Sequence, residues 1–249
     1  MLIRVEGIVI RTTDYGEGHK IITLITPTHG KFGVVVRGAK KPKSRFGFLA
    51  QLFVYGDFAV YRSGRLGTLK GGELIEPFRE LRERLDLTAF ASYAAELTDR
   101  AILDEEAGEH LFRQLLGCLT ALAQGKDPEV ILRIFEMKIF QAAGYAPVLD
   151  ACASCGASDR LGWFSAAAGG ALCAACRPRD PEAPGLGEPA RKLLQLFARL
   201  DLRRIGQIDV KEETKRQLRE ATRRWLEVHL DLRLKSLAFL DLLGRDGQA

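Results

Sequence analysis

The chain has 249 residues, of which 47% are hydrophobic and 28% are charged, so it can form a packed core and is not a disordered protein. Its length favours two or three structural units. No run of about 18 apolar residues occurs, and residues 1–7 lack a signal-peptide pattern. We therefore expect a cytoplasmic protein without a membrane span.

The net charge of +5 is unevenly distributed along the chain. Residues 1–80 carry 13 basic and 7 acidic residues, residues 81–150 carry 7 and 12, and residues 151–249 carry 17 and 13. A surface that only needs to be soluble does not require such segregation. The pattern indicates localised contact with a polyanion.

Residues 1–79 show the pattern of five short strands separated by turns about every ten residues. The apolar runs that predict these strands are residues 5–11, 21–26, 32–36, 52–61 and 66–76. Five strands with this turn spacing predict a small all-β barrel or sandwich, and strands that are apolar on both faces favour a closed barrel. A five-stranded barrel with a basic loop has the pattern of an OB-fold, which binds single strands in a charged groove lined by aromatic side chains.

The loop between the third and fourth strands is strongly basic, and no acidic residue occurs between Glu17 and Asp57. A cationic loop held between two strands can bind a phosphate backbone, but it can equally be a solvated loop that binds nothing. Phe46 and Phe48 favour nucleic acid, because bases stack on aromatic rings, unless they only anchor the loop to the core. The candidate nucleic-acid-binding residues are Lys31, Arg37, Lys40, Lys41, Lys43 and Arg45.

The hydrophobic period changes to 3.6 residues in residues 80–148 and 187–249, which predicts an α-helical domain. Expected helices cover residues 81–101, 111–125, 127–144, 188–200, the region from 211 onward, and 232–243. Asp127 followed by Pro128 predicts a capped helix start, and Gly144 a helix end.

Four basic residues recur at every fourth position in the helix that starts near residue 211: Lys211, Lys215, Arg219 and Arg223. They form either a second phosphate-contacting surface or a solvated face with ion pairs of the kind Glu212–Arg216 and Glu220–Arg224. The solvated face is the favoured interpretation.

Residues 149–186 form a cysteine-containing insertion. Cys152 and Cys155 make one C-x2-C pair, Cys173 and Cys176 make another, and 17 residues separate the pairs. Two such turns complete a closed tetrahedral shell of four thiolates, which predicts one structural zinc ion rather than a reactive dithiol. Cys118, in contrast, has the context of a buried apolar residue.

Motifs for nucleotide motors, metalloproteases and serine hydrolases are absent, so we expect a protein that is not an enzyme. Two other classes compete with DNA binding: a protein-interaction scaffold with an incidental basic surface, and, more weakly, a metal-dependent nuclease.

At this point the sequence resembles the RecO family of bacterial recombination mediators along nearly its whole length. The resemblance lies in DYGEGHKIITLITPTHGK, in RGAKKPKSRF, in FSAAAGGALCAAC and in HLDLRLKSL, of which the basic block is the most family-specific. One turn departs from the family pattern, because Gly18-His19 stands where a polar-acidic pair is expected.

The resemblance implies an OB-fold, a helical domain and a zinc ribbon. It also implies binding to single- and double-stranded DNA, strand annealing, and association with RecR to load RecA onto DNA. The single-stranded-DNA-binding protein is a further candidate partner. Because some members lack the four cysteines, zinc is expected to be scaffold rather than the source of activity.

Overall fold

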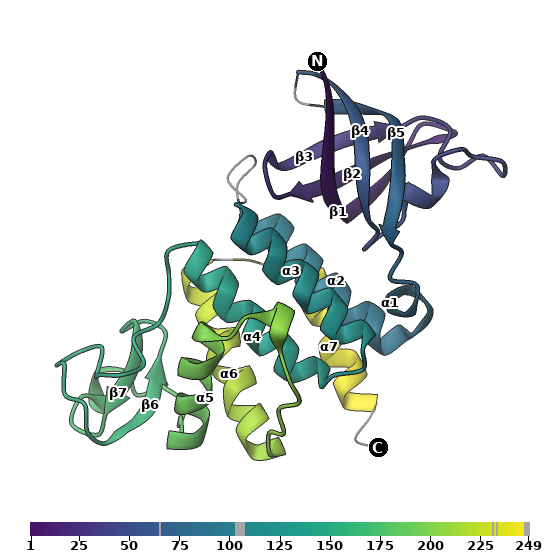
Figure 1. The fold of residues 1–249 in the computed structure, drawn as a ribbon. Helices are drawn as coiled ribbons and strands as arrows, with labels where there is room; N and C mark the ends of the chain where they lie inside the picture. Colours follow the sequence, from purple (N-terminus) through teal and green to yellow (C-terminus); the bar gives the residue numbers. More distant parts are fainter. Residues whose placement is uncertain (65, 103–107, 231, 233, 247–249) are drawn as a thin grey trace. The chain divides into compact units, whose positions relative to one another are not determined.

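The computed structural model describes residues 1–64, 66–102, 108–230, 232 and 234–246 (Figure 1). The chain forms two compact units, Met1–Gly125 together with Leu234–Ala249, and Lys126–Arg233. Within the described ranges, no helix combines the length and the apolar character needed to cross a membrane.

The first unit contains a closed five-stranded barrel, as the sequence predicts. Its strands are β1 (Leu2–Tyr15), β2 (His19–Thr26), β3 (Gly30–Val36), β4 (Tyr55–Ser63) and β5 (Leu66–Glu76), in the order β1-β2-β3-β5-β4. The long β1 pairs with β4 through its first half, up to Ile8, and with β2 from Ile8 onward, and a register shift at Val9/Arg11 lies within the pairing with β2. β3 and β5 pair in parallel and close the barrel. This arrangement confirms the predicted OB-fold.

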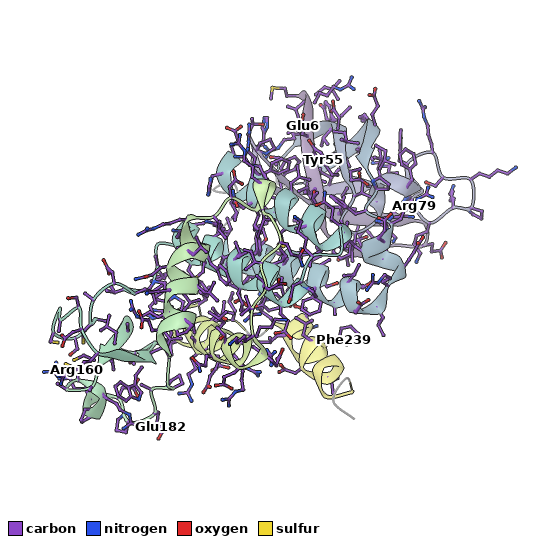
Figure 2. All side chains as sticks on the ribbon, turned by 60° about the horizontal axis from the view of Figure 1, so that its bottom comes forward. Glu6, Tyr55, Arg79, Arg160, Glu182 and Phe239 are labelled. Carbon is purple, nitrogen blue, oxygen red and sulfur yellow. The ribbon has the colours of Figure 1, made fainter. Side chains whose placement is uncertain are left out.

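The barrel closes tightly where β5 passes β4. A Cβ atom on Gly67 of β5 would lie 2.4 Å from Val60 Cγ1 of β4, closer than van der Waals contact permits. This close approach of the two strands therefore needs a glycine. The interior is apolar, and fully buried side chains include Ile22, Leu24 and Phe58. At the barrel wall, the Tyr55 hydroxyl donates a hydrogen bond of 2.7 Å to Glu6 (Figure 2). Burial and this carboxylate raise the pKa of Tyr55 to about 12.

The fourth strand starts later than expected. The prediction placed it at residues 52–61, but β4 begins at Tyr55. Phe53 has a positive φ of 67°, a turn conformation that an extended strand excludes. The hydrophobicity of residues 52–54 has another cause, because Phe53 and Val54 are buried and their backbone bonds to Val9.

The described residues of the first unit also form the helices α1 (Glu80–Glu83), α2 (Leu85–Ala101), α3 (Glu109–Ala123) and α7 (Lys235–Asp246). The single helix expected at residues 81–101 is broken at Arg84, which is extended. The next predicted helix, α3, ends just before Gly125, as expected, and Gly125 has the positive φ of 73° that is common at a helix end.

α7 packs on α2, and the side chain of Glu96 on α2 forms hydrogen bonds with the first residues of α7. The Glu96 carboxylate accepts hydrogen bonds from the amides of Lys235 (3.1 Å) and Ser236 (2.8 Å) and from the Ser236 hydroxyl (2.6 Å). Burial raises the pKa of Glu96, but these hydrogen bonds outweigh it and leave the pKa below its ordinary value.

The second unit comprises α4 (Pro128–Ala142), the two-stranded ribbon of β6 (Leu161–Ser165) and β7 (Gly170–Cys173), α5 (Glu188–Arg199) and α6 (Glu212–His229). Asp127 caps α4 as predicted, because its side chain accepts from the amides of Glu129 and Val130. α4 packs against α5 and α6 and is buried from residue 130 to 140. The helices predicted at residues 80–148 and 187–249 are thus distributed over both units.

The buried charged side chains of α4 lie close to oppositely charged or polar groups. Arg133 lies 3.0 Å from Glu136 and donates to the Thr222 hydroxyl of α6 at 2.6 Å. The Lys138 ammonium donates to the carbonyl of Ala198 at the end of α5. Because charged groups are buried only where they are bonded, these contacts fix the helices against one another.

Candidate nucleic-acid interface and metal centre

The basic loop, which we define as residues 37–46, leaves the barrel between β3 and the short 3-10 helix η1 (Gly47–Ala50) (Figure 1). Its backbone is ordered by turns: the Lys41 amide donates to Gly38 O, and the Ser44 amide donates to Lys41 O. Gly38 has a φ of 68°, and a Cβ on Gly47 would lie 2.8 Å from Ala39 O, so both glycines are required.

Two further hydrogen bonds attach the basic loop to the hairpin tip, residues 14–19, which joins β1 to β2. The Lys40 amide donates to Gly18 O at 3.2 Å. The Gly38 amide donates to His19 Nδ1 at 2.9 Å. The turn that departs from the family pattern thus fixes the start of the basic loop.

Five of the six predicted nucleic-acid-binding residues lie on the basic loop and are exposed: Arg37, Lys40, Lys41, Lys43 and Arg45. Lys40 is paired, because its ammonium lies 2.6 Å from Asp14 of the hairpin tip. The hydrogen bond from Lys40 lowers the pKa of the Asp14 carboxyl. For the other four, no carboxylate of the described chain lies within ion-pair distance. The basic loop therefore presents four uncompensated cations, which is the charge pattern of a polyanion site.

Lys31, the sixth predicted residue, lies elsewhere. Its side chain is buried, and its ammonium donates to the carbonyls of Asp99 and Ile102 and lies 3.2 Å from the Asp99 carboxylate. Lys31 thus joins β3 to the end of α2. We correct its role to a structural one, because a phosphate cannot reach this ammonium.

The two phenylalanines differ from each other. Phe46 is half-buried against the barrel core, with the Arg45 guanidinium 5.3 Å from its ring centre. Phe48 is 44% exposed and lines a groove with Leu74 and Pro77. Phe46 thus anchors the basic loop, as the alternative interpretation of this residue held.

In the second unit, Cys152, Cys155, Cys173 and Cys176 come together, with all four sulfur atoms within 4.8 Å of one another. Two turns direct them, since the Gly156 amide donates to Cys152 O and the Cys176 amide to Cys173 O. The sulfurs of Cys155 and Cys173 are 3.8 Å apart. A tetrahedral ion with metal–sulfur bonds of about 2.3 Å requires sulfur–sulfur edges of about 3.8 Å, so the donor set fits one zinc-sized ion.

The pKa of each thiol also depends on the neighbouring thiols and amides. Burial raises the pKa of Cys152, but amides of Cys173, Cys155 and Ser154 outweigh it and lower that pKa to about 6. The Ala157 amide lowers the pKa of Cys155, yet the three neighbouring cysteines raise it to about 11. One thiolate is therefore stabilised by the fold, whereas several together need a cation.

The ribbon packs on α6 through aromatic side chains. Phe164 of β6 lies 5.5 Å, ring centre to ring centre, from Trp225, which is itself 3.9 Å from His229. The His229 ring is hydrogen-bonded to Ala166 O at 2.9 Å, and the Trp225 indole donates to Tyr145 O. These contacts join the four-cysteine lobe to the helices of the second unit.

Sequence comparisons agree with both halves of this architecture. The family model described as "Recombination protein O N terminal" matches residues 1–78, and "Recombination protein O C terminal" matches residues 82–238. The chain belongs to the RecO family. It is 44% identical over 241 residues to the "DNA repair protein RecO" of Bacillus pumilus, and 43% identical to that of Bacillus subtilis. Each alignment covers 97% of this chain and 94% of the relative. The Halalkalibacterium halodurans protein of the same name is 42% identical, with 99% and 97% covered.

In this RecO-family chain, the basic stripe of α6 is largely compensated. Lys215 lies 2.5 Å from Asp127, Arg219 lies 2.6 Å from Glu129, and Arg223 lies 3.3 Å from Glu227. The favoured interpretation as an ion-paired face agrees with these contacts. Of the two predicted pairs, Glu220–Arg224 is present at 3.4 Å, whereas Arg216 pairs with Glu213 instead of Glu212.

Sequence reasoning missed the contact of the hairpin tip with the basic loop. Asp14 and His19 contact the basic loop although they are about twenty residues away in the chain. The contact could have been predicted from the strand order. In an antiparallel sheet, the turn between the first and second strands lies beside the end of the third strand.

Proposed function

We propose that this RecO-family protein is a DNA repair protein that binds single- and double-stranded DNA. We further propose that it promotes strand annealing and, with RecR, the loading of RecA during recombinational repair. The observation that carries the DNA-binding step is the ordered basic loop with its four uncompensated cations on an OB barrel. The names of the relatives support the repair context.

The proposed mechanism is electrostatic. Two complementary strands repel each other through their phosphates, and cations held on one loop reduce this repulsion without covalent chemistry. The barrel orders the loop before DNA arrives, so little conformational entropy is lost on binding. Because contacts to phosphates carry no sequence information, binding is expected to be independent of base sequence.

The salt dependence of binding tests this proposal quantitatively. Four neutralised phosphates predict a log–log slope of about −2.8 for single strands and about −3.6 for duplex DNA. Replacing Lys40, Lys41 and Lys43 by Ala should flatten both slopes and weaken binding to every sequence. Fluorescence anisotropy with labelled oligonucleotides at several salt concentrations measures both quantities.

A matched control removes the same charge from the second unit. Lys192, Arg199 and Arg204 are exposed there, outside the basic stripe of α6, and changing all three to Ala alters the net charge equally. This variant should keep the slope and the affinity of the wild type. Equal effects of the two triple variants, or an unchanged affinity after the loop triple, would remove the basic loop from the proposed function.

A protein-interaction scaffold is the second candidate, and exposed apolar side chains favour it. Phe48, Leu74 and Ile75 of the first unit are at least 40% exposed. RecR and the single-stranded-DNA-binding protein are the proposed partners. Recruitment to DNA that is insensitive to salt and requires a partner would favour this candidate over direct DNA binding.

We also propose that the four cysteines hold one structural zinc ion. The closed set of four thiolates leaves no position for a substrate, so the ion would stabilise the ribbon rather than take part in chemistry. Metal analysis of the purified protein should give one zinc per chain.

A further inference from the structure

The hairpin tip and the basic loop form one continuous surface in the first unit. Three contacts join them: Lys40 N to Gly18 O, Gly38 N to His19 Nδ1, and the Lys40 ammonium to Asp14. A ligand bound by the basic loop therefore also meets the hairpin tip.

The strand register shows which side chains of the hairpin tip share a face with the basic loop. Asp14 pairs with Lys20, and Lys20 pairs with Val36, which is buried in the barrel. Side chains alternate along a strand, so the next row faces outward. That row contains the pair Tyr15–His19, and the ring of His19 accepts from the amide of Gly38, which places the row beside the start of the basic loop.

An aromatic ring and a cation are both exposed beside this row. Tyr15 is 52% exposed, and Arg37 is exposed and has no carboxylate partner in the described part of the chain. Arg37 directly precedes Gly38, whose amide donates to His19, the pairing partner of Tyr15. Since both side chains are long, they can contact the base and the phosphate of one nucleotide.

The other aromatic candidates near the basic loop are less suitable. Phe46 packs against the barrel core, and Phe48 faces the groove formed with Leu74 and Pro77. Tyrosine also serves this role well, because a base can stack on its ring whatever the sequence.

We propose that Tyr15 stacks on an unpaired base of single-stranded DNA whose backbone lies on the basic loop, and that His19 is a positioning residue for that loop. The inference rests on the proposed DNA binding and adds a residue that distinguishes single strands from duplex. In duplex DNA the bases are already stacked on one another and are not available to Tyr15.

The test compares Tyr15→Ala and Tyr15→Phe on single-stranded and duplex oligonucleotides. Loss of one base–ring contact should weaken single-strand binding by roughly 5- to 150-fold. Duplex affinity and both salt slopes should stay unchanged, because no cation is lost. Tyr15→Phe keeps the ring and should bind like the wild type.

Outcomes that contradict the inference are distinct from those that contradict DNA binding. If Tyr15→Ala leaves single-strand affinity unchanged, or weakens single-strand and duplex binding equally, Tyr15 does not stack on a base. If the Lys40, Lys41 and Lys43 triple variant binds normally, the proposed function itself fails.

The positioning role of His19 has its own readout. Asn can place an acceptor oxygen near the position of His19 Nδ1, whereas Leu cannot. His19→Leu should expose the Gly38 amide to hydrogen exchange and weaken binding to both forms of DNA, while His19→Asn should restore both. Normal Gly38 protection and normal binding in His19→Leu would overturn the role.

Discussion

The ion pair between Asp14 and Lys40 makes a quantitative prediction. Asp14→Asn removes the carboxylate that lies 2.6 Å from the Lys40 ammonium and converts Lys40 into a fifth uncompensated cation. With five phosphates neutralised instead of four, the expected log–log salt slope changes from about −2.8 to about −3.5 for single strands, and from about −3.6 to about −4.5 for duplex DNA. Affinity at low salt should rise for both forms.

The assay is anisotropy of labelled DNA between about 50 and 200 mM salt, the range in which such slopes are well determined. Glu17→Gln is the matched control. It removes one negative charge from the same hairpin tip, but Glu17 makes no ion pair with Lys40 in the structure. Its slope should remain that of the wild type. An unchanged slope for Asp14→Asn, or equal changes for both variants, would refute the idea that Asp14 holds back Lys40.

Three further predictions concern stability. Lys31→Met should destabilise the fold by about 2–3 kcal/mol, because buried acceptors lose their donor, while the DNA affinity of the folded variant stays unchanged; urea unfolding and anisotropy check the two parts. Cys155→Ser should lose the metal and alter the fluorescence of the two tryptophans, Trp163 and Trp225, whereas Cys118→Ala should keep one metal per chain; metal analysis and emission spectra decide. Glu96→Ala should destabilise α7 by about 1–2 kcal/mol at neutral pH. Folding lowers the pKa of Glu96, so its contribution to stability is present above the unfolded pKa and disappears as pH falls through the folded pKa. The stabilities of wild type and variant should therefore become equal in acid. Hydrogen exchange of the α7 amides measures this difference.

Features set by local rules were predictable from the sequence. The Asp127 cap depends on one side chain and the two amides that follow it, so the sequence pattern is sufficient. The cysteine cluster depends on two tight turns whose spacing is visible in the chain. The barrel could be predicted because each strand is short and each turn carries its own residues.

Features set by distant neighbours were not predictable. Lys31 differs from the loop lysines only in its surroundings, because its partners Asp99 and Ile102 lie at the end of α2 and directly after it, about seventy residues away. Arg84 breaks a helix whose apolar period continues across it. The pairing of Asp14 with Lys40 requires the register of three strands, which no short pattern contains.

The placement of α7 affects how this protein is made. The polypeptide leaves the first unit at Gly125, passes through the whole second unit and returns only at Leu234. During synthesis on the ribosome, α7 can therefore pack on α2 only after more than a hundred later residues have been translated. Until then the part of α2 that α7 contacts stays uncovered, and exposed apolar surface of this kind makes a nascent chain prone to aggregation.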